Sequence, residues 1–164
     1  MAIATKNLTQ NLGNEGSGAP LVHEIFTQIN NAKDKPKKIE ILKKYDSPAI
    51  RQLLKAAFDP NIQWDLPEGI PPYIANEAPA GTEHTSLLSA ARKLYHFVVG
   101  GNNTINKLKK ETMFIQVLEG LQQKDAEVLI AIKNKNLNNI YKGLTAQMVK
   151  ETFNWDDNFV RITK

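Results

Sequence analysis

Five residues near the carboxyl end of the chain have the types and spacing of a phosphate-binding turn. Lys133 and Lys135 lie where a predicted helix ends, and Lys142, Gly143 and Thr145 form a Gly-x-Thr turn before the next helix. Backbone amides in such a turn and at a helix start can bind a phosphate, and the lysines supply positive charge. An ordinary helix joint, in which Gly143 ends one helix and Thr145 caps the next, explains the same residues.

Two further groups of lysines are candidates for phosphate contact. Lys107, Lys109 and Lys110 lie in the first turns of a predicted helix, where positive charge opposes the helix dipole, so helix stability does not explain them. Lys43 and Lys44 end a lysine-rich predicted helix. A solvated lysine face is the alternative for each group. Residues 56–91 contain no lysine or arginine, which predicts a surface divided by charge.

The residue types needed for most catalytic sites are missing or badly spaced. There is no cysteine, so thiolate nucleophiles, disulfides and zinc-finger ligand sets are excluded. His23, His84 and His96 are scattered without metal-ligand spacing, and neither Gly-x-Ser-x-Gly nor a phosphate-binding Gly-rich loop occurs. We therefore expect no enzymatic activity, no cofactor, no metal and no small-molecule substrate.

The hydrophobic pattern predicts an all-α fold, a compact bundle of about six or seven helices. Apolar residues recur at helical spacing, while five of the eight prolines fall in residues 59–83, which we expect to form a long ordered loop. We expect a flexible arm over residues 1–19 and a single helical domain over residues 20–164. The predicted helices cover residues 20–32, 36–45, 48–58, 85–99, 105–122, about 125–141 and 146–153, with a short strand-like piece at 62–66.

Composition limits the class of protein further. The chain has 164 residues, a net charge of +4 and a pI of about 9.2, which is compatible with a polyanionic partner. No apolar run approaches the length of a membrane helix, and residues 1–19 lack the pattern of a secretory signal. We expect a cytoplasmic protein without membrane contact.

The order of these elements resembles the N-terminal DNA-binding domain of ATP-dependent DNA ligases, especially the short phage type. The lysine-rich helix at 37–44, the irregular aromatic stretch at 62–67 and the serine-led helix at 86–98 follow the order of that family. Asp125-Ala126-Glu127-Val128-Leu129 and the turn Gly143-Leu144-Thr145 resemble the family's last helix and turn. The resemblance covers roughly residues 20–153.

The resemblance implies a module that binds double-stranded DNA through its backbone, in phage-type replication or repair and thus in a host cytoplasm. It does not imply ligation, because the adenylation signature Lys-x-Asp-Gly is missing and Lys44-Tyr45-Asp46-Ser47 lacks the glycine. Ile130 and Ala131 stand where the family has arginines. The alternative is a structural or adaptor protein, in a virion or replication complex, that binds protein through residues 1–19 or 59–83.

Overall fold

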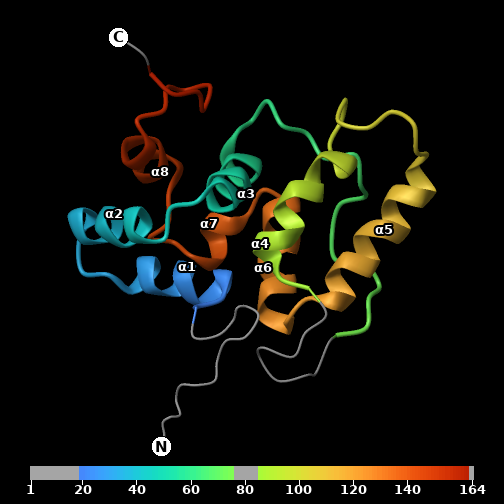
Figure 1. Ribbon diagram of the computed structural model, residues 1–164, viewed down its shortest axis with the longest axis horizontal. Helices are drawn as coiled ribbons and strands as arrows, with labels where there is room; N and C mark the ends of the chain where they lie inside the picture. The colour runs from blue at the N-terminus through green and yellow to red at the C-terminus, as the bar shows by residue number, and fades with distance from the viewer. Residues whose placement is uncertain (1–18, 76–84, 163–164) are drawn as a thin grey trace, which may run out of the picture.

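The computed structural model describes residues 19–75 and 85–162, and these residues form a helical bundle (Figure 1). The predicted all-α fold is confirmed. The expected arm lies outside the described residues except for Ala19. The helical elements are α1 (Val22–Asn31), α2 (Lys35–Lys44), α3 (Pro48–Phe58), α4 (Leu87–Ala90), the 3-10 helix η1 (Ala91–Phe97), α5 (Lys107–Gly120), α6 (Gln123–Lys133), α7 (Leu137–Ile140) and α8 (Ala146–Phe153).

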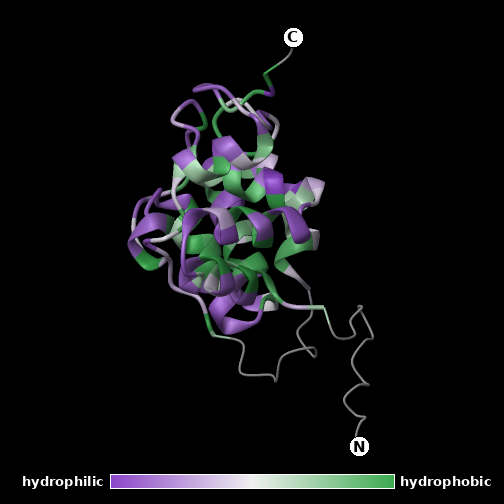
Figure 2. Cartoon of the chain, turned by 90° about the vertical axis from the view of Figure 1, so that its left-hand side faces the viewer, coloured by the Kyte–Doolittle hydropathy of each residue, from purple (hydrophilic) through white to green (hydrophobic). Residues whose placement is uncertain are grey.

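Helix α6 is the centre of the bundle. It contacts α1, α3, α4, α5 and α7. Eight of its eleven residues are buried, including the acidic Asp125 and the basic Lys133. A helix that is apolar around most of its circumference must be enclosed by other elements. The hydropathy colouring shows the result, with hydrophobic residues facing the interior between the helices and hydrophilic residues facing outward (Figure 2).

Side-chain caps fix where several helices begin. Thr145 accepts a hydrogen bond from the Met148 amide, as the sequence predicts, and Ser47 accepts one from the Ile50 amide. Helix α6 begins earlier than predicted, because the Gln122 side chain caps it by accepting from the amides of Lys124 and Asp125. The Asp125 side chain therefore does not cap α6, and it accepts hydrogen bonds from His23 of α1 instead.

The predicted helix over residues 85–99 is wrong in its second half. Four α-helical residues are followed by the 3-10 turns of η1, and Val98 is extended. The cause is a pairing with the proline-rich segment, in which Asp65 N donates to Phe97 O and Val99 N donates to Gln63 O, both at 2.7 Å. Trp64 and Val98 form an isolated β-bridge, which is the strand-like piece predicted at 62–66.

The proline-rich segment, residues 59–75, is ordered and covers the bundle. Trp64, Leu66 and Tyr73 pack partly buried against the core. Ile70 and Ile74 do not, since 77% and 79% of their surfaces are exposed. Leu108 in the first turn of α5 is also 72% exposed.

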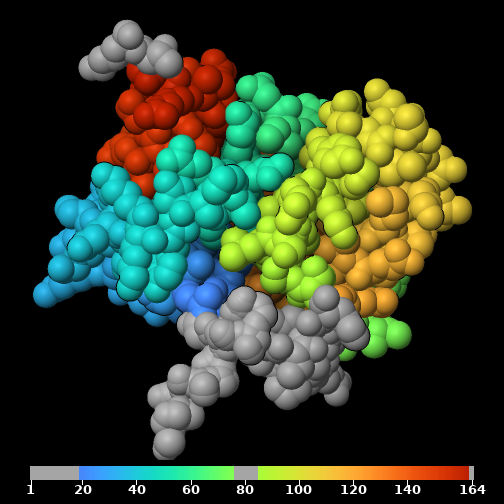
Figure 3. Space-filling model, in the orientation of Figure 1, coloured from blue at the N-terminus to red at the C-terminus, as the bar shows by residue number. Residues whose placement is uncertain are grey.

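The two ends of the bundle are formed by different helices. In Figures 1 and 3, α1 and α2 lie at the left, α8 at the upper left and α5 at the right.

Within residues 19–75 and 85–162, no helix has both the length and the apolar character needed to cross a membrane.

Candidate nucleic-acid interface

Lys133 points into the protein. Its side chain is 5% exposed, and Nζ donates to Pro67 O at 2.7 Å, to Gly69 O at 2.8 Å and to Asn134 Oδ1 at 2.6 Å. These bonds use all three donors of an ammonium group. The same Asn134 amide donates to Gly69 O at 3.1 Å. Lys133 and Asn134 therefore fasten the proline-rich segment to the end of α6.

Lys135 caps helix α3. Its residue surface is exposed, but Nζ reaches back to donate to Ala56 O at 2.7 Å and to Asp59 O at 2.9 Å. The backbone of Lys135 is left-handed, with φ of 59°, as the chain leaves α6. Carbonyls at a helix end lack partners within the helix, and a lysine there satisfies them and favours the dipole.

Burial lowers the pKa of both lysines. Desolvation is the main cause for Lys133 and for Lys135, because it penalises the charged ammonium. Glu68 partly offsets this effect on Lys133, and Asp59 does so on Lys135. The predicted basic exit of α6 is thus a pair of desolvated anchors, and its lysines do not spread over an open surface.

The Gly143 turn is docked on the joint between α1 and α2. Gly143 N donates to Asn30 Oδ1 at 2.7 Å, so this amide is already bonded. Lys38 Nζ binds the carbonyls of Ile29, Asn30 and Ala32 at 3.0 Å each. A Cβ on Gly143 would lie 2.7 Å from Lys38 Nζ, so a larger residue here would displace that ammonium. Lys142, beside this contact, is exposed.

The lysines of α5 divide between inside and outside. Lys110 is 4% exposed and forms an ion pair with Asp65 at 2.8 Å. The hydrogen bond from Lys110 is the main cause that lowers the pKa of Asp65. Lys107 lies 3.6 Å from the other oxygen of Asp65 but is largely exposed, and Lys109 is exposed as well. Lys110 therefore anchors the proline-rich segment, as Lys133 does.

Lys43 and Lys44 are exposed in the last turn of α2, where positive charge favours the helix dipole. Lys44 also lies over the Tyr45 ring, 5.3 Å from its centre. Helix α2 and the start of α5 lie at opposite ends of the molecule (Figures 1 and 3). The structure therefore brings Lys142 to the α1–α2 end, and leaves Lys107 and Lys109 elsewhere.

The positive charge of the chain is concentrated at α2. Residues 33–44 contain six lysines and two acidic residues, a net charge of +4 that equals the net charge of the whole chain. Lys35 pairs with Glu151 of α8 at 2.6 Å, and Lys38 binds carbonyls. Among the described residues, no carboxylate lies within ion-pair distance of the exposed lysines Lys33, Lys37, Lys43 and Lys44.

Comparison with known families gives one match. A model described as a family of unknown function (DUF6433) matches residues 25–139. The chain belongs to this family. The matched range holds α2 and α6 in full and ends before the Gly143 turn. Comparisons with curated proteins and with solved structures found no significant match. The resemblance of this DUF6433 chain to DNA ligase domains stays a prediction.

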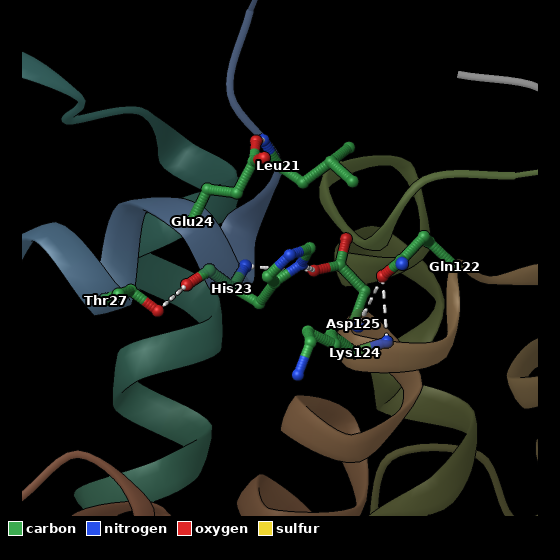
Figure 4. A network of polar contacts seen from close by, with 7 residues as sticks. All are labelled: Leu21, His23, Glu24, Thr27, Gln122, Lys124 and Asp125. Atoms are coloured by element: carbon green, nitrogen blue, oxygen red, sulfur yellow. Dashed lines mark hydrogen bonds and ion pairs between the residues drawn. The ribbon is translucent and has the colours of Figure 1, made fainter. Parts of the chain in front are cut away.

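One polar pair was missed by sequence reasoning. Asp125 is 2% exposed, and its Oδ1 accepts from both the backbone N and the Nδ1 of His23, each at 2.9 Å (Figure 4). The residues are 102 positions apart, so their spacing carries no signal. His23 lies in the first turn of α1, where the Asp125 carboxylate acts as a cap supplied by another helix.

His23 lines an open cleft of about 870 Å³ between α1, α6 and α7, whereas Asp125 is buried behind it and is not a lining residue. The cleft hydroxyls are those of Thr27 and Tyr141, and the Thr27 hydroxyl donates to His23 O at 2.7 Å. A nucleophile needs its hydroxyl bonded to the histidine base, and this hydroxyl is bonded to a carbonyl. In residues 19–75 and 85–162, no group of three or more His, Asp or Glu side chains is arranged to hold a metal. We assign the pair to helix docking.

Proposed function

We propose that this protein binds double-stranded DNA without catalysis, through phosphate contacts made by the α2 surface. The α2 surface comprises Lys33, Lys37, Lys43 and Lys44, together with Lys142 from the adjoining turn. The DNA ligase resemblance and the basic pI support the proposal, and replication or repair in a phage-type setting is the context that the resemblance implies.

The observation that carries the proposal is the concentration of charge. The net charge of residues 33–44 equals that of the whole chain. The ammonium groups of the α2 surface form no ion pairs with the described carboxylates. Exposed lysines on one element attract a polyanion and release its counterions. Lysine is a point charge without the planar fork of arginine, so such a surface favours backbone contact over base reading.

A salt-titrated binding assay tests the proposal. Fluorescence anisotropy with a duplex of about 25 base pairs should show affinity falling linearly on log–log axes, with a slope of about −0.9 per phosphate neutralised. Lys43→Glu/Lys44→Glu should weaken binding at low salt and make the slope shallower by about 1–2. Affinity that is flat between about 50 mM and about 200 mM salt would exclude backbone contact.

The matched control is Arg92→Glu/Lys93→Glu, which makes the same charge change at two exposed residues of η1. The control should lower affinity only through net charge and leave the slope nearly unchanged. Equal losses in both variants would mean that the α2 surface is not the contact. Lys107→Glu/Lys109→Glu, at the other end of the bundle, shows whether the α5 lysines contribute.

One observation favours the alternative of a protein-binding adaptor. Ile70 and Ile74 are exposed in a segment held at one end by Lys133 and at the other by Glu119, which accepts from Ile74 N at 2.8 Å. A preorganised apolar segment binds a partner with less entropy loss. If the purified protein retained no DNA and copurified with a stoichiometric protein lost on Ile70→Asp, the adaptor function would replace DNA binding.

A further inference from the structure

A cavity of about 800 Å³ lies between the proline-rich segment and the end of α6. Trp64, Pro67, Glu68, Lys133, Lys135 and Asn136 are among its lining residues. Lys133 and Lys135 therefore line the same open cavity.

Neither ammonium group at this cavity forms an ion pair with a described carboxylate, and Asp59 acts on Lys135 only from beyond ion-pair distance. Lys133 and Lys135 bind only carbonyl and amide oxygens, and among the described residues no carboxylate lies within 4.0 Å of either Nζ. Glu68 is exposed at the rim and acts on Lys133 from farther away. Desolvated charge without a partner is costly, and an anion arriving in the cavity would offset that cost.

Hydrogen-bond donors also remain at the cavity. Lys135 Nζ uses two of its three donors, on Ala56 O and Asp59 O. Trp64 Nε1 is buried and has no hydrogen-bond partner in the described part of the chain. Trp64 is a lining residue of the cavity, so the signal of this covered indole N–H reports on what enters the cavity without bonding to it.

We propose that this cavity binds a phosphate group, with Lys133 and Lys135 supplying charge and the third donor of Lys135 supplying a hydrogen bond. A phosphate carries up to two negative charges, which match the two ammonium groups, and its oxygens accept from several donors at once. The cavity is larger than a phosphate ion and has room for an attached organic group. The phosphate belongs to a small phosphorylated molecule or to a nucleic-acid backbone, and the site does not depend on the α2 surface.

Nuclear magnetic resonance of the tryptophan indole N–H groups tests the site. The chain has two tryptophans, Trp64 and Trp155, and Trp155→Phe assigns their two signals. Titration of the full-length protein with inorganic phosphate should shift the Trp64 Nε1–H signal saturably. Sodium chloride at equal ionic strength should not reproduce the shift, and Trp155 should not respond. A Trp64 signal that ignores phosphate, or that follows chloride equally, overturns the proposal.

Variants tie the response to Lys135. Lys135→Met should weaken phosphate binding by about tenfold or more, as loss of a charged donor predicts, while Lys135→Arg should retain most of it. The matched control, Lys109→Met, removes an exposed lysine outside the cavity and should leave binding unchanged. Equal loss in Lys135→Met and Lys109→Met overturns the site. If Lys135→Met fails to fold, the wild-type titration against chloride decides alone.

A second titration identifies the source of the phosphate. If a duplex of about 25 base pairs shifts the Trp64 signal and phosphate competes with it, the site holds a backbone phosphate. If phosphate shifts Trp64 and the duplex does not, the ligand is a small phosphorylated molecule. Loss of duplex binding in Lys43→Glu/Lys44→Glu without loss of the phosphate response separates the two sites.

Discussion

Asp125 Oδ1 accepts two hydrogen bonds from His23, one from the backbone N and one from Nδ1, both at 2.9 Å. A single carboxylate oxygen thus caps α1 and orients the imidazole of its first turn (Figure 4). Because α6 supplies the cap, the start of α1 is fixed to the centre of the bundle. The contact replaces a local cap, which Leu21 at the N-cap position does not provide as a side-chain hydrogen bond.

Replacing Asp125 should destabilise the whole bundle. Asp125→Ala removes the cap and leaves a donor of His23 without its partner, at a cost of about 2–3 kcal/mol in the free energy of unfolding. Asp125→Asn keeps an accepting oxygen and should cost less. Urea denaturation followed by circular dichroism measures both. Asp157→Ala, which removes a 98% exposed carboxylate, is the control and should change stability by less than about 0.5 kcal/mol.

Removing Lys133 should loosen the proline-rich segment without unfolding the helices. Lys133→Met keeps the buried stem and deletes the three bonds of Nζ. The amide of Gly69, which donates to Asn134 Oδ1, should then exchange with deuterium about tenfold to a hundredfold faster. Lys109→Met should leave the exchange rate unchanged. Unaltered exchange at Gly69 in Lys133→Met would show that Asn134 alone holds the segment.

The desolvated lysines Lys133 and Lys135 should make the free energy of unfolding depend on pH in the alkaline range. Burial lowers the pKa of Lys133 and of Lys135 in the folded protein, whereas the unfolded chain holds its lysine protons up to about pH 10.4. Between the lowered pKa and that value the unfolded state binds more protons, so the free energy of unfolding rises as pH increases. Urea denaturation at a series of pH values should show this rise in the wild type.

The double variant Lys133→Met/Lys135→Met should show a smaller rise. Tyr141 limits the pH range in which the two proteins can be compared. Burial raises the pKa of Tyr141, so the contribution of this residue to the free energy of unfolding falls as pH rises above about 10. The comparison therefore belongs below about pH 9.5. Equal slopes in wild type and double variant would mean that neither lysine is desolvated in solution.

A methyl group on Gly143 should disturb the joint between α1 and α2. The Cβ of Gly143→Ala would lie 2.7 Å from Lys38 Nζ and 3.0 Å from Asn30 O, so the ammonium must shift and its bonds to three carbonyls are strained. We expect a loss of about 1–3 kcal/mol in the free energy of unfolding. In a Lys38→Ala background the same substitution should cost less, and a double-mutant cycle measures the difference. Strict additivity would contradict the contact.

Local pattern was sufficient for most of the fold. The Thr145 cap and the helical spacing of apolar residues in α1, α3 and α8 depend on neighbouring residues, and the structure confirms them. The second half of the 85–99 helix could not be predicted, because its end is imposed by Trp64 and Asp65 from a distant segment. Tertiary pairing there overrides the local helical pattern.

The candidate site shows a different limit. The sequence identifies Lys133 and Lys135 as basic, but their partners are main-chain carbonyls 64–79 positions away, which no side-chain pattern marks. The sequence alone does not distinguish a lysine that anchors a loop from a lysine that binds a phosphate. Lys142 lies exposed beside the Gly143 contact.

The central position of α6 has a consequence for synthesis. Helices α1, α3 and α4 each pack against α6, which ends at Lys133 in a chain of 164 residues. As the chain is made from its amino end, those three helices leave the ribosome before the element that covers their apolar faces. The nascent chain must therefore hold exposed hydrophobic surface until α6 emerges, and the core closes only after that point.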